Sequence, residues 1–377
     1  MVVEKKLYDF CIVCNENFED LVAEELKRIC KKTSTMGNGF VFFQGTLEDV
    51  MRYIYLTQSS KKVLLSLMVF KYKDEFKLLK DIETLNDDFF SFIDGSFSIR
   101  SNLHHIERDV GSAIYKKLSN PVVEMSNPDY PMNIHISENS AVLGIELSEG
   151  DLSKRTYKIF SHPSSIKGTL AYFLVAISGY NGKGLFLDPC CGSGTICAEA
   201  GYLASGMSLR YFDKSKILSS KMFEGIDTSH FFKKLDDEVK SKKDNLSKKT
   251  EIRAYDIDLQ SVNATKKNLK IGGIEKFVSV AKGDIDWLET KFKENSVDYV
   301  VSNPSAYTKT NTKKSDKFFD IFFYQTEFIL SKKGKIVLLL NSERPLEFAK
   351  KYKLIPKLEK KLGLGDAEKY IYSFTKK

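Results

Sequence analysis

The pattern of apolar and polar positions changes along the chain, and its first part alternates short strands with amphipathic helices. Apolar residues recur every three or four positions in the helical segments and form short runs in the strands. Gly37-Asn38-Gly39 marks a turn in front of one strand. The expected elements, in chain order, are a strand at 8–14, a helix at 18–29, a strand at 40–44, a helix at 47–56 and a strand at 62–70. This order predicts an α+β unit of ferredoxin-like type over residues 1–70.

A second unit with the same kind of pattern follows over residues 71–152. Its expected elements are an extended segment at 96–101, a helix at 108–117 and strands at 132–137 and 140–147. Strands and helices are again mixed without a strict repeat. We therefore expect a second α+β domain here.

From residue 153 onward the pattern becomes α/β, with short buried strands followed by helices. A helix is expected at 165–178, after a linker at 153–164. The expected strands are 185–188, 252–255, 278–282, 298–301 and 335–340, with a closing antiparallel pair at 353–362 and 369–374. These strands predict one mixed seven-stranded sheet over 153–377. The polar, lysine-rich stretch 204–249 is expected to be a mostly helical insertion between the first two strands, ending in a mobile segment at 241–250.

With 42% hydrophobic and 29% charged residues, the composition is that of a globular protein. A chain of 377 residues is too long for one ordinary hydrophobic core, so we expect two or three domains. No apolar stretch approaches the ~20 residues that span a bilayer. The first apolar positions are interrupted by Asp9, Asn15 and Glu16, whereas a signal peptide has an uninterrupted apolar core. We expect a cytoplasmic monomer without membrane contact.

The net charge of +8 and the pI near 8.9 fit a polyanionic partner, because lysine and arginine release counterions from phosphates on binding. A solvated surface rich in lysine explains the same charge, so charge alone leaves both readings open. Cys11 and Cys14 form a single CxxC in a strand, no second pair completes a tetrahedral site, and the five histidines lack ligand spacing. We predict no metal site and no disulfide framework.

A glycine-containing loop between a buried strand and a helix is the strongest chemical signal. The strand ends at Asp188, Gly192 and Gly194 follow, and the helix opens at Thr195. Glycines allow a ligand to approach the backbone at the carboxyl edge of the sheet. The spacing fits neither a Walker A loop nor GxGxxG, and an opening acidic residue favours an amine-bearing ligand over a phosphate. We assign six residues of this segment to the ligand site: Asp188, Pro189, Cys190, Gly192, Gly194 and Thr195.

Two further carboxylates end the next two strands. Asp256, followed by Ile257, is placed to bind the hydroxyls of a ribose, and Asp284 could accept the amino group of an adenine whose ring packs on Ile285. Helix capping explains each aspartate singly. Together with Asp188, however, they predict a nucleoside site.

The fourth strand runs into Asn303-Pro304-Ser305-Ala306-Tyr307, which resembles the Asn-Pro-Pro-Tyr motif of amino methyltransferases. In that motif an asparagine accepts hydrogen bonds from an exocyclic amine, and an aromatic ring stacks on a flipped base. Ser305 replaces the second proline, and Tyr307 comes one position late. The resemblance implies catalytic roles for Asn303, Pro304, Ser305 and Tyr307.

The chain as a whole resembles the THUMP-domain RNA methyltransferases, which make N2-methylguanine in tRNA and ribosomal RNA. Asp188-Pro-Cys-Cys-Gly-Ser-Gly-Thr is similar to the Asp-Pro-Met-Cys-Gly-Ser-Gly-Thr of that family. Residues 152–171 resemble the linker and first helix that lead into its catalytic domain.

The resemblance implies a class I, Rossmann-like methyltransferase domain over 153–377, preceded by the ferredoxin-like domain and a THUMP domain over 71–152. It implies S-adenosyl-L-methionine (SAM) as cofactor, with His162, Pro163 and Ser165 bordering its methionine end and Asn303 beside it. The implied substrate is the N2 amine of a guanosine in structured RNA, with tRNA favoured and ribosomal RNA possible. Two alternatives stay open: an amino methyltransferase of DNA or protein, and an RNA-binding protein that has lost catalysis.

Overall fold

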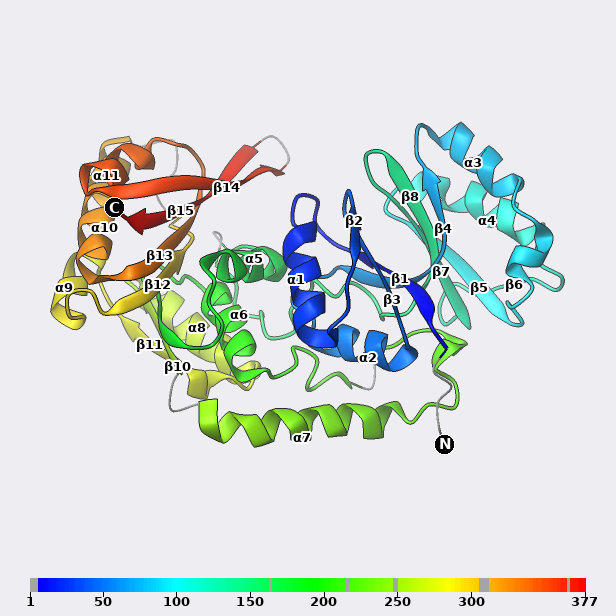
Figure 1. Ribbon diagram of the computed structural model, residues 1–377, viewed down its shortest axis with the longest axis horizontal. Coiled ribbons are helices and arrows are strands. Elements are labelled where there is room, and N and C mark those ends of the chain that lie inside the picture. The colour runs from blue at the N-terminus through cyan, green and yellow to red at the C-terminus, as the bar shows by residue number, and fades with distance from the viewer. Residues whose placement is uncertain (1–5, 163–164, 215–216, 247–249, 305–311, 365–366) are drawn as a thin grey trace. The chain divides into compact units, whose positions relative to one another are not determined.

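The computed structural model describes residues 6–162, 165–214, 217–246, 250–304, 312–364 and 367–377 (Figure 1). The chain forms two compact units. The first comprises Met1–Ser153 with Arg210–Asp236, and the second comprises Lys154–Leu209 with Asp237–Lys377.

The first unit is built on one eight-stranded sheet with the strand order β2-β3-β1-β4-β8-β7-β5-β6. Its strands are β1 (Tyr8–Val13), β2 (Thr35–Gly37), β3 (Phe40–Gly45), β4 (Lys62–Lys71), β5 (Ser96–Ser101), β6 (Val122–Val123), β7 (Tyr130–Ile136) and β8 (Ser140–Glu146). Its longer helices are α1 (Glu19–Cys30), α2 (Leu47–Leu56), α3 (Glu75–Glu83) and α4 (Glu107–Tyr115). Strand β4 pairs with both β1 and β8, so the two predicted α+β patterns share a single sheet.

Local sequence explains where the elements of this unit begin and turn. Asn38 and Gly39 form the two-residue turn between β2 and β3, and Gly39 has a positive φ of +75°, which favours glycine. Thr46 begins α2 with a capping box, in which its side chain and that of Asp49 each accept a hydrogen bond from the other's backbone N–H. The turn and the helix expected from the sequence are thus confirmed.

The second unit contains a seven-stranded mixed sheet in the order β11-β10-β9-β12-β13-β15-β14, as the sequence predicts. The strands are β9 (Gly184–Asp188), β10 (Thr250–Asp256), β11 (Val278–Lys282), β12 (Val297–Ser302), β13 (Leu330–Leu340), β14 (Leu354–Leu364) and β15 (Ala367–Lys376). The first five strands in the order are parallel, and β15 runs antiparallel to both its neighbours. Chain order reverses between β9 and β12, which is where an open α/β sheet binds its ligand.

Helices cover both faces of this sheet (Figure 1). One layer contains α5 (Gly168–Ser178), α6 (Thr195–Ser205) and α8 (Leu259–Ile271), and the other contains α9 (Leu288–Lys291), α10 (Thr312–Ile329) and α11 (Pro345–Lys351). The predicted helix at 165–178 begins three residues later than expected, because the Lys167 backbone is extended (φ −61°, ψ 146°).

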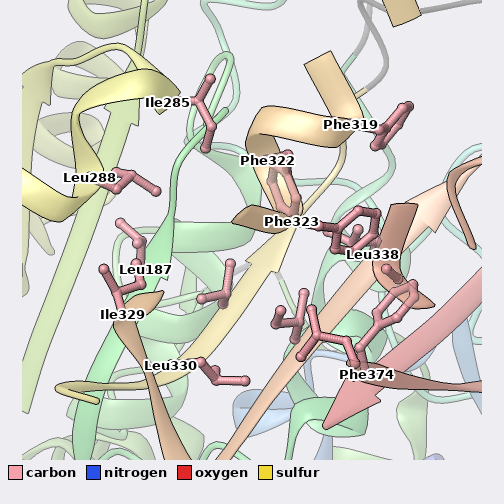
Figure 2. Close-up of a cluster of buried hydrophobic side chains, with 14 of the residues drawn as sticks. Leu187, Ile285, Leu288, Phe319, Phe322, Phe323, Ile329, Leu330, Leu338 and Phe374 are labelled. Atoms are coloured by element: carbon pink, nitrogen blue, oxygen red, sulfur yellow. The ribbon is translucent and has the colours of Figure 1, made fainter. Parts of the chain in front are cut away.

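Phenylalanines of α10 form much of the core on one face of the sheet. Phe319, Phe322 and Phe323 pack with apolar residues of the strands and with Ile285, as Figure 2 shows. Phe322 and Phe323 are fully buried. Ile285 belongs both to this core and to the strand-end region described below, so packing in α10 supports that region directly.

The insertion between β9 and β10 folds in part against the first unit. The Ser219 amide donates to the Leu147 carbonyl over 3.1 Å, which extends the sheet beyond β8. The Tyr55 hydroxyl donates to Asp236 over 2.6 Å, and the Tyr55 and Phe232 rings lie 4.7 Å apart.

Helix α7 (Thr228–Leu246) is the main regular element of the insertion. Between the end of α6 and the start of α7, the described residues form turns, a β-bridge at Leu218 and a short 3-10 segment at Lys221–Phe223. The expectation of a mostly helical insertion is therefore confirmed only for its second half. The helix continues to Leu246, well into the segment expected to be mobile. Residues 247–249 lie outside the described part of the chain.

Candidate functional site

The loop after β9 brings backbone close to the carboxyl edge of the sheet. Gly192 and Gly194 have φ angles of +54° and +80°, which favour glycine. A Cβ atom at Gly194 would lie 2.5 Å from Cγ2 of Thr265 in α8. Glycine at 194 is therefore needed both for its backbone angle and for close packing against α8.

Asp188 is buried at the end of β9 and only partly satisfied. Its Oδ1 accepts from the Ser302 hydroxyl over 2.7 Å and from the Cys190 amide over 3.2 Å. Its Oδ2 is buried without a hydrogen-bond partner in the described part of the molecule. Burial raises the pKa of Asp188 to about 7, and the charge of Asp256 adds to the increase. An unsatisfied buried carboxylate oxygen of this kind is suited to a cationic donor.

Asp256 connects the ends of β9 and β10. Its Oδ2 accepts from the Gly192 amide over 2.8 Å, and its Oδ1 accepts from the Asp258 amide over 2.9 Å. The side chain that caps α8 is that of Asp258, not Asp256. Asp284 does cap a short 3-10 segment, through the Asp286 amide at 3.2 Å. The capping alternative therefore applies to Asp284 but not to Asp256.

A cavity of about 190 Å³ opens at these strand ends. The sequence-predicted residues that line it are His162, Pro189, Cys190, Gly192, Asp256, Ile257, Asp284, Ile285, Asn303 and Pro304. A smaller cavity of about 20 Å³ is lined by the predicted residues Ser165, Asp188, Cys190, Gly192, Thr195 and Asn303. Both cavities share Cys190, Gly192 and Asn303, so the predicted residues line two adjoining cavities.

Some predicted site residues do not line either cavity or lie outside the described part of the chain. Gly194 acts instead as the left-handed residue that begins α6. Pro163, Ser305 and Tyr307 lie outside the described residues, as does Ala306 of the same motif.

The sequence analysis missed several residues of the site. Asp258, Ser261, Gly283 and Phe318 also line the larger cavity. Gly283 and Asp258 adjoin the predicted aspartates, so their neighbourhood is a usable signal. Phe318 has none, because it is one of several phenylalanines on α10, and only the packed structure brings it to the strand ends.

Cysteines near the site are not poised as nucleophiles. Burial and the neighbouring Asp188 raise the pKa of the Cys190 and Cys191 thiols well above their usual value. Among the described residues no group of three or more His, Cys, Asp or Glu is arranged to hold a metal ion. No helix in the described ranges has the length and apolarity needed to cross a membrane.

A family model described as RMKL-like, methyltransferase domain matches residues 155–367, more than half of the chain. This protein belongs to the RMKL-like methyltransferase family. Models described as RlmL ferredoxin-like domain and THUMP domain match residues 9–64 and 72–146. The THUMP-containing organisation expected from the resemblance is confirmed.

Two relatives of this RMKL-like chain differ in how much of their length it matches. It is 28% identical over 302 residues to the ribosomal RNA large subunit methyltransferase K/L of Desulfotalea psychrophila, covering 74% of this chain and 41% of that protein. It is 24% identical over 360 residues to the tRNA (guanine(6)-N2)-methyltransferase of Methanocaldococcus jannaschii, covering 89% and 91%. The chain thus spans under half of the K/L relative and nearly all of the second.

A solved structure agrees with the fold of this RMKL-like protein. SMU.472, crystallised in complex with SAH, has a TM-score of 0.76 at 21% identity, covering 99% of both chains. At this identity the likeness establishes the fold.

Proposed function

We propose that this protein transfers a methyl group from SAM to the exocyclic N2 of a guanosine in structured RNA, with tRNA as the favoured substrate. The observation that carries the proposal is the cavity in which Asp256, Asp284 and Asn303 meet at neighbouring strand ends. Family membership supports the methyltransferase activity, and the tRNA-modifying relative that matches over most of its length favours tRNA.

The residues around the two cavities fit SAM. The buried Oδ2 of Asp188 lacks a donor among the described residues, and the methionine ammonium would supply one. Asp256 would accept from the ribose hydroxyls and Asp284 from the adenine amino group, while Ile257 and Ile285 provide apolar surface for the ring. When bound, SAM supplies a methyl group on a positively charged sulfur.

Asn303 would orient the substrate amine. It lines both cavities and so lies where the amino-acid side of the site meets the nucleoside side. Its side-chain oxygen would accept a hydrogen bond from the exocyclic amine and direct the nitrogen lone pair toward the methyl group. The amine held by Asn303 would accept the methyl group that bound SAM supplies and would release its proton to water. His162 would border the cofactor, and Ser305 and Tyr307 remain candidates from the sequence motif alone.

The amino-terminal unit supports RNA over DNA or protein as substrate. The THUMP and ferredoxin-like models match it over most of its length, and the tRNA relative aligns across both parts of the chain. A net charge of +8 favours the phosphate backbone. We therefore propose that this unit selects the RNA, while the strand-end cavity carries out the transfer.

Methyl transfer to unmodified tRNA transcripts tests the proposal. Radiolabelled SAM is supplied, and mass spectrometry of the digested nucleosides identifies the product as N2-methylguanosine. Asn303→Ala is expected to lower the turnover rate by about a hundredfold or more, as loss of a transition-state hydrogen bond does. The exposed Asn263 of α8 provides a matched control, and Asn263→Ala should retain the wild-type rate.

Other outcomes of the same assay would redirect the proposal. Label on ribosomal RNA, DNA or protein but not on tRNA would replace the substrate. Binding of S-adenosylhomocysteine without transfer to any RNA would identify an RNA-binding protein that has lost catalysis, in keeping with Ser305 at the second proline position.

A further inference from the structure

Asn268, on the buried side of α8, bonds to two chain segments that are distant in sequence. Its side chain is 1% exposed. Its Nδ2 donates to the Ser193 carbonyl over 3.0 Å and to the Phe160 carbonyl over 2.8 Å. Its Oδ1 accepts from the Phe160 amide over 3.0 Å. One amide group therefore satisfies three backbone groups.

The orientation of this amide is fixed by its partners. Both carbonyls need a donor, and the Phe160 amide needs an acceptor, so exchanging Oδ1 and Nδ2 would lose all three hydrogen bonds. An aspartate could accept from Phe160 but would place an oxygen against two carbonyl oxygens. The position is selective for asparagine on chemical grounds, beyond its size.

The two segments joined by Asn268 are both parts of the cavity wall. Ser193 lies in the glycine loop, and its hydroxyl is 2.8 Å from the Ser165 hydroxyl. Phe160 precedes His162 by two residues, and His162 lines the larger cavity. Asn268 thus fixes the spacing between the glycine loop and the linker that carries His162.

The earlier part of the same linker is held by a different contact. Arg155 forms a two-point ion pair with Glu199 of α6, at 2.8 and 3.1 Å, and both side chains are almost completely buried. The Tyr157 hydroxyl also donates to Glu199, over 2.7 Å. This ion pair holds the earlier part of the linker, whereas Asn268 bonds to the later segment beside the cavity.

Helix α8, which carries Asn268, begins beside Asp256 on the nucleoside side of the site. Asp258 caps the helix, and Asp256 precedes the cap and accepts from the Gly192 amide. Further along the same helix, the Thr265 hydroxyl donates to the Gly192 carbonyl over 2.8 Å. The glycine loop is therefore bonded to α8 at two positions, Thr265 and Asn268, and of these two Asn268 also bonds to the linker within the described contacts.

We propose that Asn268 is a positioning residue of the cofactor site, which aligns the glycine loop and the linker at Phe160 for cofactor binding and takes no part in RNA binding or in methyl transfer itself. The proposal rests on the proposed function, because it assigns the pocket to SAM. It predicts a selective effect on the cofactor.

Calorimetric titration with S-adenosylhomocysteine, combined with steady-state kinetics, tests this role. Asn268→Ala is expected to raise the Kd for S-adenosylhomocysteine and the KM for SAM by about tenfold, since three buried backbone groups lose their partner. The kcat at saturating SAM and the KM for RNA should stay near wild type. Asn268→Asp should weaken binding at least as much, and Asn263→Ala on the exposed side of α8 should have no effect.

Hydrogen exchange at Phe160 gives a second measurement that needs no mutation. In the wild-type protein S-adenosylhomocysteine should slow exchange at this amide. If the alanine variant does not fold, Asn268→Ser, whose hydroxyl can replace only part of the hydrogen bonding of the amide, should exchange the Phe160 amide faster than the wild type and bind S-adenosylhomocysteine more weakly. If the wild-type protein binds S-adenosylhomocysteine, the positioning role is overturned by any of three results: no slowing of exchange at Phe160, an unchanged Kd in the variants, or a fall in kcat with an equal rise in the KM for RNA. A wild-type protein that does not bind S-adenosylhomocysteine would instead overturn the proposed function.

Discussion

Ionisation of Asp188 makes the stability of the free protein depend on pH. Burial raises its pKa from 3.8 to about 7. At 1.36 kcal/mol per pKa unit, the folded protein holds the ionised form about 4 kcal/mol less favourably than the unfolded chain does. Because Asp188 has a higher pKa in the folded protein than in the unfolded chain, the free energy of unfolding falls as the pH rises from about 4 to about 7. Between about pH 6 and pH 8 the expected loss is about 1 kcal/mol.

A cationic ligand should reverse part of this loss. The methionine ammonium would stabilise the ionised carboxylate through its unsatisfied Oδ2, so binding would lower the pKa of Asp188. Affinity for S-adenosylhomocysteine is then expected to rise by up to about tenfold between about pH 6 and pH 8. Asp188→Asn removes the titration while keeping the shape of the side chain.

Denaturant unfolding and calorimetry across this pH range provide the assay. The wild-type protein should lose stability and gain affinity with pH, whereas Asp188→Asn should lack both trends and bind more weakly throughout. Cys190 and Cys191 should not contribute, because their raised pKa keeps the thiols protonated. The reasoning is refuted if the asparagine variant shows the same pH dependence as the wild type, or if wild-type affinity does not change with pH.

Three further predictions follow from the same contacts. Arg155→Ala should lower the free energy of unfolding by about 3–5 kcal/mol, measured by denaturant titration, because it leaves Glu199 buried without its cation. Gly194→Ala should weaken S-adenosylhomocysteine binding in calorimetry, and Thr265→Ser should restore part of it, since Cγ2 is the atom nearest the added methyl group. Three exposed lysines lie in the first turns of α10: Lys313, Lys314 and Lys317. Replacing all three with alanine should weaken RNA binding and reduce the slope of log affinity against log salt concentration by about 2. Alanine at the exposed Lys332 and Lys333, at the opposite end of the strands, should leave both unchanged.

The strand ends of the second unit could be predicted from the sequence because buried parallel strands are short apolar runs with polar residues directly after them. Asp188, Asp256 and Asn303 follow this pattern, and the structure brings them to one edge of the sheet. The parallel order itself then decides which side chains meet. Local sequence was sufficient for these residues.

Residues that reach the site from helices could not be predicted in this way. Phe318 and Asn268 lie in helical patterns in which a buried phenylalanine or asparagine has no distinctive neighbours. Their role depends on which strand or loop the helix packs against, and this is a tertiary property. The pairing of the insertion with the first unit could not be predicted either. Nothing in residues 217–219 indicates that they pair with the residues that follow β8.

The docking of Arg210–Asp236 means that the chain completes its first unit only after the second has begun. A fragment ending at Ser153 would lack Asp236, the acceptor for the buried Tyr55 hydroxyl, and Phe232, which packs on the Tyr55 ring. Dissection into independent RNA-binding and catalytic pieces therefore calls for a circular permutation or a grafted insertion. For the same reason, the amino-terminal unit can complete its folding during synthesis only after the ribosome has translated the glycine loop and residues Arg210–Asp236.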